Sequence, residues 1–146
     1  MATVTVTTRI VVDDPQSDRI TREFTKTVAS LTTVQEFQRT LVTATTISLW
    51  DPTVSGTGVP ADFDILVLVS DQTVLIEFTI DEGNANEQLL PITLAAGQPL
   101  VLCDDAAIRG TYTGGDGFTG TTDVIDKLRV KNASGSTATL YLLIGT

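Results

Sequence analysis

Residues 64–81 decide the fold class, and they read Asp64-Ile-Leu-Val-Leu-Val-Ser-Asp-Gln-Thr-Val-Leu-Ile-Glu-Phe-Thr-Ile-Asp81. The first half, Ile65 to Val69, is apolar at every position, which is typical of a central strand with both faces buried. The second half, Val74 to Ile80, places its apolar residues at period two, which is typical of a strand with one face on a core. We therefore predict a hairpin that turns near Asp71 and Gln72 and forms the middle of an all-β domain.

The composition favours the same fold class. The chain has 146 residues, of which 42% are hydrophobic, and this suits one compact domain with a real core. Thr, Val and Ile are abundant, and their branching at Cβ suits a pleated sheet better than a helix. We predict a single antiparallel β-sandwich domain over residues 1–146, jelly-roll-like, with about eight to ten short strands joined by polar turns.

The N-terminal segment alternates Thr with Val, which predicts a strand over residues 2–12. Such a strand either completes the protein's own sheet, which we favour, or forms an arm over residues 2–14 that adds to a neighbour's edge. Residues 20–31 predict a second strand, and the polar turn at 13–18 between the two allows a first hairpin.

The remaining strands are separated by polar turns. Thr33 and Glu36 match a helix capping box, so residues 33–39 are expected to form one turn of helix or a plain loop. Further strands are predicted over residues 40–50, 88–94, 99–103, 124–131 and 137–145, the last two as a closing hairpin.

The residue types argue against several chemistries. The chain has no His, which removes the Ser-His-Asp and Cys-His mechanisms and most zinc sites. Cys103 is the only Cys, so no intrachain disulfide can form, and the chain suits a reducing cytosol. The carboxylates fall almost wholly in predicted turns, and Asp116 with Asp123 in the Gly-rich segment 113–123 is a thin supply of ligands for calcium. We therefore expect no enzymatic activity, no metal and no other cofactor.

Charge and hydropathy argue against two classes of partner. The formal net charge is -9, which repels phosphate backbones, so we do not expect a nucleic-acid partner. No apolar stretch approaches the ~20 residues of a membrane helix, and the N-terminus lacks the basic start and apolar run of a signal peptide. We therefore do not expect a membrane partner either.

A few apolar and aromatic residues are candidates for partner binding. Trp50 stands at the entrance of the loop 51–62, where it either anchors an interface or, more commonly, closes the end of a sandwich core. The last strand carries Tyr141 and Leu143 on one face and the central strand carries Leu66 and Leu68, so either a second sheet or a subunit must cover them. We expect a symmetric homo-oligomer, and the candidate binding residues are Val4, Val6, Trp50, Tyr112, Phe118 and Tyr141.

Two segments carry a resemblance. Residues 92–102 form an apolar strand, an Ala-Gly turn and another apolar strand, and residues 125–145 close with Leu-Tyr-Leu-Leu-Ile-Gly. In this, about the last third of the chain resembles small β-sandwich structural proteins of tailed-phage virions, including head decoration (cement) proteins. The resemblance implies a non-enzymatic virion component that is assembled in the host cytoplasm. It also implies an oligomer, with a trimer favoured, that binds the major capsid protein or another virion protein.

Two alternatives stay open. The first is a carbohydrate- or receptor-binding module of a phage fibre or tail, which would use Trp50, Tyr112 and Phe118 as stacking platforms. The second is a cytosolic, cupin-like jelly roll that binds a small molecule, although the metal-binding histidines of cupins are missing here.

Overall fold

The computed structural model describes residues 1–12, 20–53, 60, 62–80, 87–103 and 125–146. Within these ranges the regular structure is entirely β-strand, as predicted. The strands are β1 (Ala2–Val12), β2 (Ile20–Leu31), β3 (Val34–Leu41), β4 (Thr46–Trp50), β5 (Ile65–Ser70), β6 (Val74–Ile80), β7 (Gln88–Leu94), β8 (Pro99–Leu102), β9 (Ile125–Asn132) and β10 (Ala138–Gly145).

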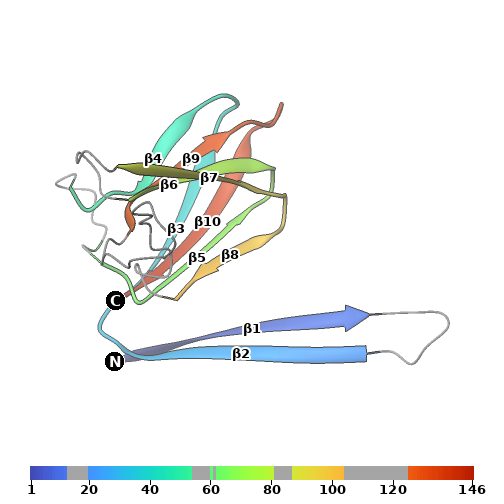
Figure 1. Cartoon of the computed structure of the whole chain (residues 1–146), viewed down its shortest axis with the longest axis vertical. Coiled ribbons are helices and arrows are strands. Elements are labelled where there is room, and N and C mark those ends of the chain that lie inside the picture. Colours follow the sequence, from blue (N-terminus) through green and yellow to red (C-terminus); the bar gives the residue numbers. More distant parts are fainter. Residues whose placement is uncertain (13–19, 54–59, 61, 81–86, 104–124) are drawn as a thin grey trace, which may run out of the picture.

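Eight of the strands form two four-stranded antiparallel sheets that pack face to face (Figure 1). One sheet has the order β3-β10-β5-β8 and the other has the order β4-β9-β6-β7, and we name them the β10 sheet and the β9 sheet. The pairs β3–β10, β4–β9, β5–β8 and β6–β7 are nested, so this part of the chain is one long hairpin rolled up on itself. That nesting is the pattern of a jelly roll and confirms the predicted β-sandwich.

The stretch 64–81 does not form the predicted hairpin. β5 belongs to the β10 sheet and β6 belongs to the β9 sheet, so the turn at Asp71 and Gln72 crosses between the sheets. β9 and β10, predicted as a closing hairpin, are divided between the sheets in the same way. The reason is that each of these strands has one strongly apolar face, and two such faces bury each other when they oppose across a core.

The core lies between the two sheets. Leu66 and Leu68 of β5 contribute to it from the β10 sheet, and Ile76 and Phe78 of β6 contribute from the β9 sheet; all four are fully buried. The second sheet thus supplies the cover that Leu66 and Leu68 were expected to need.

β3 replaces the single helical turn or loop expected at residues 33–39. It pairs with β10 along its whole length, from Val34 opposite Gly145 to Leu41 opposite Ala138. The backbone N–H and C=O groups that would form hydrogen bonds within a helix instead pair with β10, so the tertiary pairing outweighs the local capping-box signal. The predicted strand 40–50 is also divided, because a turn reverses the chain between Leu41 and Thr46. In that turn the Thr45 amide donates to the Val42 carbonyl (3.2 Å), and Ala44 has a φ of 62°.

A buried amide, Asn132, joins the elements at this end of the sandwich. Its Nδ2 donates to the carbonyls of Leu41 (2.7 Å) and Ser136 (2.8 Å). Its Oδ1 accepts hydrogen bonds from the backbone amide (2.9 Å) and the hydroxyl (2.7 Å) of Ser134. The side chain is fully buried and all of its hydrogen-bonding capacity is used, which couples the end of β3 to the β9–β10 turn.

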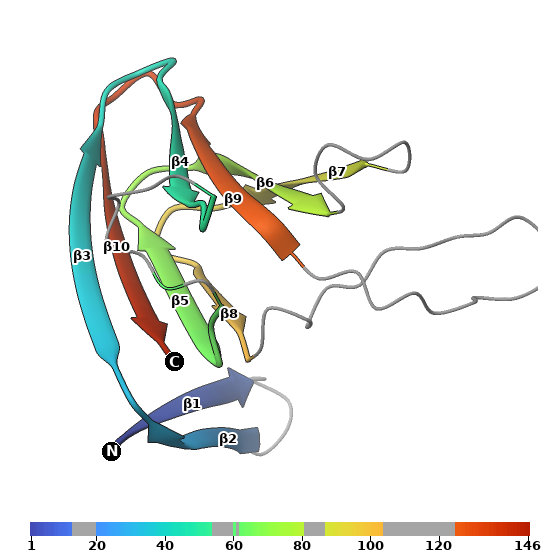
Figure 2. The ribbon, with the colours of Figure 1, turned by 90° about the vertical axis from the view of Figure 1, so that its left-hand side faces the viewer.

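β1 and β2 form a separate two-stranded sheet, which we name the hairpin arm (Figure 1). The strands pair from Ala2 opposite Leu31 to Val12 opposite Ile20. This confirms the predicted first hairpin, but β1 extends neither sheet of the sandwich. Figure 2 shows the arm at the end of the sandwich where β3 begins and β10 ends.

Replacement of Ala44 by Gly is expected to stabilise the protein. A positive φ is strained for Ala and unstrained for Gly, so Ala44→Gly should raise the free energy of unfolding by about 1 kcal/mol. Urea denaturation measures the change. The matched control is Ala95→Gly, at a position outside the positive-φ region, where the added chain entropy should lower stability by about 0.5–1 kcal/mol. Equal losses in both variants would contradict the prediction.

Replacement of Asn132 by Ala is expected to be strongly destabilising. Asn132→Ala leaves the buried Leu41 carbonyl without its side-chain donor, and we expect a loss of about 2–3 kcal/mol in the free energy of unfolding. Ser134→Ala removes only bonds at the edge of this network and should cost about 1 kcal/mol. Urea denaturation of both variants gives the comparison, and a cost for Asn132→Ala no larger than that for Ser134→Ala would refute the role of the amide.

Candidate functional site

The outer face of the β10 sheet is apolar, although it does not face the other sheet. The strand register places Leu143 of β10 between Glu36 of β3 and Val67 of β5. It places Tyr141 in the same way between Gln38 and Val69. β8 continues both rows, because Val101 lies opposite Val67 and Pro99 lies opposite Val69. We name this surface the apolar face; its residues are Val67, Val69, Pro99, Val101, Tyr141 and Leu143.

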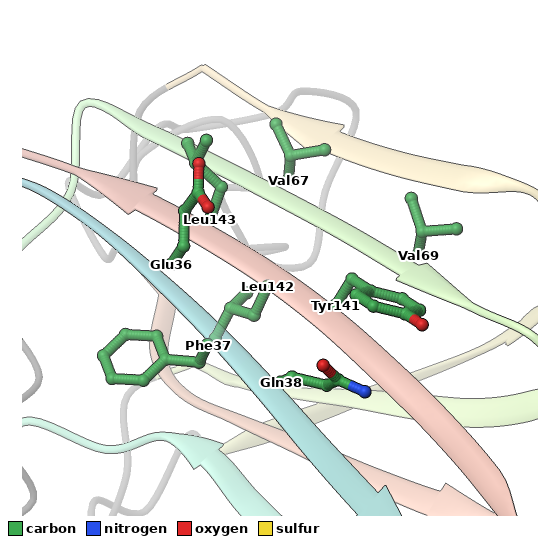
Figure 3. A pocket seen from close by; sticks show the side chains of 8 residues that line it. All are labelled: Glu36, Phe37, Gln38, Val67, Val69, Tyr141, Leu142 and Leu143. Carbon is green, nitrogen blue, oxygen red and sulfur yellow. The ribbon is translucent and has the colours of Figure 1, made fainter.

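The apolar face is open to solvent. Tyr141 is 51% exposed, and Val67, Val69 and Leu143 are half-buried. The face is hollowed over β3, β10 and β5 by a depression of about 490 Å³ (Figure 3). The prediction that β5 is buried on both faces is therefore wrong for Val67 and Val69. The predicted apolar outer surface around Tyr141 and Leu143 is confirmed.

The outer face of the β9 sheet has a different character. Arg129 of β9 forms an ion pair with Glu77 of β6, in which its Nε donates to Glu77 Oε1 at 2.8 Å. Lys131, on the same side of β9, is exposed. Charged side chains that pair with one another suit a solvated surface. The same face also carries the exposed Leu75 and Leu89, so it is mixed in character. The six residues of the apolar face include no charged side chain, which makes that face the stronger candidate for contact with a partner.

The hairpin arm also has one apolar side. Val4 lies opposite Val28, Val6 opposite Lys26 and Thr8 opposite Phe24, and cross-strand partners share a face. The other side of the arm carries Thr5, Thr7 and Arg9 opposite Thr27, Thr25 and Glu23. Phe24 is 60% exposed, while Val4, Val6 and Val28 are half-buried. We name Val4, Val6, Phe24 and Val28 the apolar side of the arm.

The arm is anchored to the sandwich at its root. Leu31, the last residue of β2, is fully buried against Gly145 and Ile65. A Cβ atom at Gly145 would lie 2.9 Å from both the Leu31 Cδ1 and the Ile65 Cγ2, so only glycine lets the arm root approach β10 this closely. The Thr146 carbonyl accepts hydrogen bonds from the Thr33 amide (3.1 Å) and the Thr32 hydroxyl (3.0 Å).

The candidate residues from the sequence divide into three groups. Val4, Val6 and Tyr141 lie on the apolar surfaces described above. Tyr112 and Phe118 lie outside the described residues. Trp50 is only 1% exposed; its Nε1 donates to the Pro60 carbonyl (3.0 Å) and its ring meets Phe63 edge-on with centroids 5.2 Å apart. Trp50 thus closes the end of the core, as the favoured interpretation held, and its ring is not open for stacking in this structure.

Phe24 and Val67 were missed as candidates. The signal for Phe24 was present, since a large aromatic residue stood in a Thr-rich strand with charges on both faces. Val67 and Val69 were hidden by the assumption that a continuous apolar strand is covered on both sides.

A buried carboxylate, Asp51, fixes the segment beside Trp50. Its Oδ1 accepts hydrogen bonds from the Thr53 amide (3.1 Å) and hydroxyl (2.6 Å), and its Oδ2 lies 3.2 Å from Lys127 Nζ. Burial raises the pKa of Asp51, but the hydrogen bonds from Thr53 and Lys127 and the Lys127 charge outweigh it, so the pKa lies below its ordinary value. These contacts occupy both carboxylate oxygens of Asp51, so its role is structural.

Other kinds of site were also sought in the described ranges. There, no three His, Cys, Asp or Glu side chains gather closely enough to hold a metal ion. Cys103 is a half-buried free thiol. No helix within the described ranges is long and apolar enough to cross a membrane.

No protein-family model matches the chain, and no curated protein is significantly similar to it. The finding is an all-β protein with two packed antiparallel sheets and a hairpin arm.

Asp51 is expected to make stability depend on pH. A carboxylate whose pKa is lowered by folding stabilises the protein above its unfolded value, here 3.8, and this contribution is lost as the pH falls through the folded pKa. At pH 7 we expect Asp51→Asn to lower Tm by about 2–4 °C relative to wild type. That difference should shrink as the pH falls below 3.8 and through the lowered pKa of Asp51. Thermal melts of both proteins across this range provide the test, with the exposed Asp64→Asn as a charge-matched control. A wild-type-to-variant difference that does not change with pH would contradict the prediction.

Proposed function

We propose that the protein is a non-enzymatic structural component of a virion, a decoration (cement) protein that binds and stabilises the head shell as an oligomer. The observation that carries the proposal is the hairpin arm beside an uncovered sheet face. A two-stranded hairpin is marginally stable by itself in water, and among the described residues no second layer covers the apolar side of this one. A protein that carries such an arm is suited to assembly with partners.

The apolar face supports the same function. Contiguous exposed apolar surface on a small protein generally marks an interaction site. The arm and the apolar face give each protomer two such surfaces, through which copies can join into an oligomer. Several modest contacts made together bind far more tightly than one, which is what a protein that clamps neighbouring shell subunits requires. The resemblance of the closing strands to phage decoration proteins agrees with this assignment.

A carbohydrate-binding module of a fibre or tail has weaker support. Stacking on sugars needs an exposed aromatic ring, and the buried Trp50 does not offer one. Tyr141 is exposed, but it lies in an apolar row between Val69 and Gln38 instead of among the several polar groups that would orient a sugar.

On this proposal a virus encodes the chain, and the test is binding to undecorated capsids of that virus. We expect the protein to co-sediment with these capsids and to raise the temperature at which they disrupt. Phe24→Ser on the apolar side of the arm should weaken capsid binding by about 30-fold, because loss of this exposed aromatic anchor weakens the oligomer whose several contacts hold the shell, while the sandwich core is untouched. The matched control, Thr25→Ser on the opposite side, should bind like wild type. Absence of binding by the wild-type protein would overturn the proposal.

A further inference from the structure

We infer that the hairpin arm of one copy packs, through its apolar side, on the apolar face of a second copy, so that protomers exchange arms. The inference rests on the oligomeric assembly in the proposed function and names the partner of the arm. Its test needs no capsid, so the two proposals can fail separately.

The first step is that the chain already uses this packing at the arm root. Leu31 of β2 is buried on the outer side of the β10 sheet, over Gly145 and beside Ile65. Gly145 is paired with Ile65 and lies two residues beyond Leu143 on β10, so Leu31 covers the row that adjoins Leu143 and Val67. The apolar face therefore begins next to a place where the arm root already packs on this sheet. The two rows of the apolar face, which follow the row of Gly145 and Ile65, are not covered by the arm.

The second step is that the arm does not cover these rows within its own chain. Figures 1 and 2 show both arm strands beyond the end of the sandwich, where β3 begins, instead of alongside β10 and β5. The hydrogen bonds of Thr32 and Thr33 to Thr146 hold the root in this position. Just before it, Ser30 has a φ of 65° and the pairing of β1 with β2 shifts register, which turns the arm away. Within the described residues nothing else covers these rows, and the inference assigns the cover to a second copy of the chain.

The third step is that the two surfaces match in chemistry. The apolar side of the arm carries one charged residue with a described side chain, Lys26, which lies between Phe24 and Val28 along β2. The apolar face is bordered by Glu36, which lies opposite Leu143 and is exposed. No basic side chain within the described ranges forms an ion pair with Glu36. Among the described side chains, each surface thus offers apolar contacts and one charge, and the two charges have opposite sign.

Charge over the whole chain agrees with this pairing. Residues 1–33 contain four basic residues (Lys or Arg) and four acidic residues (Asp or Glu), so their formal net charge is zero. Residues 34–146 contain five basic and fourteen acidic residues, so their formal net charge is -9. Two sandwiches repel each other through this excess of negative charge. A neutral arm can approach the sandwich of another copy without that cost.

The fourth step is size. β1 has 11 residues, which at ~3.3 Å per residue gives an arm about 36 Å long, and two strands are about 10 Å wide. The apolar face is shorter than the arm: its two rows span about 13 Å and its four strands about 19 Å, which limits each contact to about 250 Å² on both partners. Two reciprocal contacts then bury about 1,000 Å² in total, the lower limit for a specific protein interface.

The experiment is a charge exchange between Lys26 and Glu36, read out as molar mass by sedimentation equilibrium without capsids. The wild-type protein should form an oligomer of the 15.5 kDa protomer. Lys26→Glu places two acids in each contact and Glu36→Lys places two bases there, so each variant alone should dissociate about 10-fold more readily. An equal mixture of the two variants should re-associate, because the new Glu of one copy meets the new Lys of the other, and the original pair forms in the second contact.

The controls change the same charges elsewhere. Arg9→Glu and Glu23→Lys lie on the opposite side of the arm and should leave the oligomer at wild-type strength. All four positions are exposed, so the sandwich should fold in every variant. A monomeric wild-type protein, or a mixture that stays dissociated, would overturn arm exchange. An oligomer with the expected charge dependence that fails to bind capsids would leave the inference standing and overturn the proposed function.

Discussion

A β-sheet must have at least one face covered, and the organisation of this protein follows from how each sheet meets that requirement. The two four-stranded sheets cover each other's inner faces, with Leu66 and Leu68 on one side of the core and Ile76 and Phe78 on the other. The hairpin arm has no such partner within the described part of its own chain beyond the contact of Leu31 at its root. The inner faces of the sandwich therefore cover each other, whereas the arm and the apolar face have no further cover among the described residues, which is the basis for proposing an assembly.

The apolar periodicity was enough to predict the fold class and most of the strands. Val74 to Ile80 and the closing strands have the period of two that half-buried strands require, and both occur where expected. Pairing was not predictable, because a short polar turn such as Asp71-Gln72 serves equally well between neighbours in one sheet and between two packed sheets. The strand at Val34–Leu41 was missed because its pairing with β10 lies far away in sequence and outweighs a local capping signal.

The candidate site was predictable only in part. Tyr141 stood out because an aromatic ring faced away from an otherwise clear core pattern. Val67 and Val69 did not, since one sequence cannot show whether a fully apolar strand is covered by its own chain or by another. Trp50 illustrates the opposite case: a Trp beside a loop looks like a contact residue, yet its contacts with Phe63 and Pro60 close the core. Burial on the second face of a strand is decided by topology, which periodicity does not encode.

The nested pairing of the strands also sets an order of events in time. Val34 pairs with Gly145, so the β10 sheet closes only when segments at opposite ends of the sandwich sequence have met, and such distant contacts make folding slow. The arm strands are close in sequence and pair by a local turn, so they can form early. If copies exchange arms as proposed, the surface that accepts an arm is thus completed after the arm itself. A newly made chain would then be able for a time to offer an arm but unable to receive one, which would delay association until each sandwich has folded.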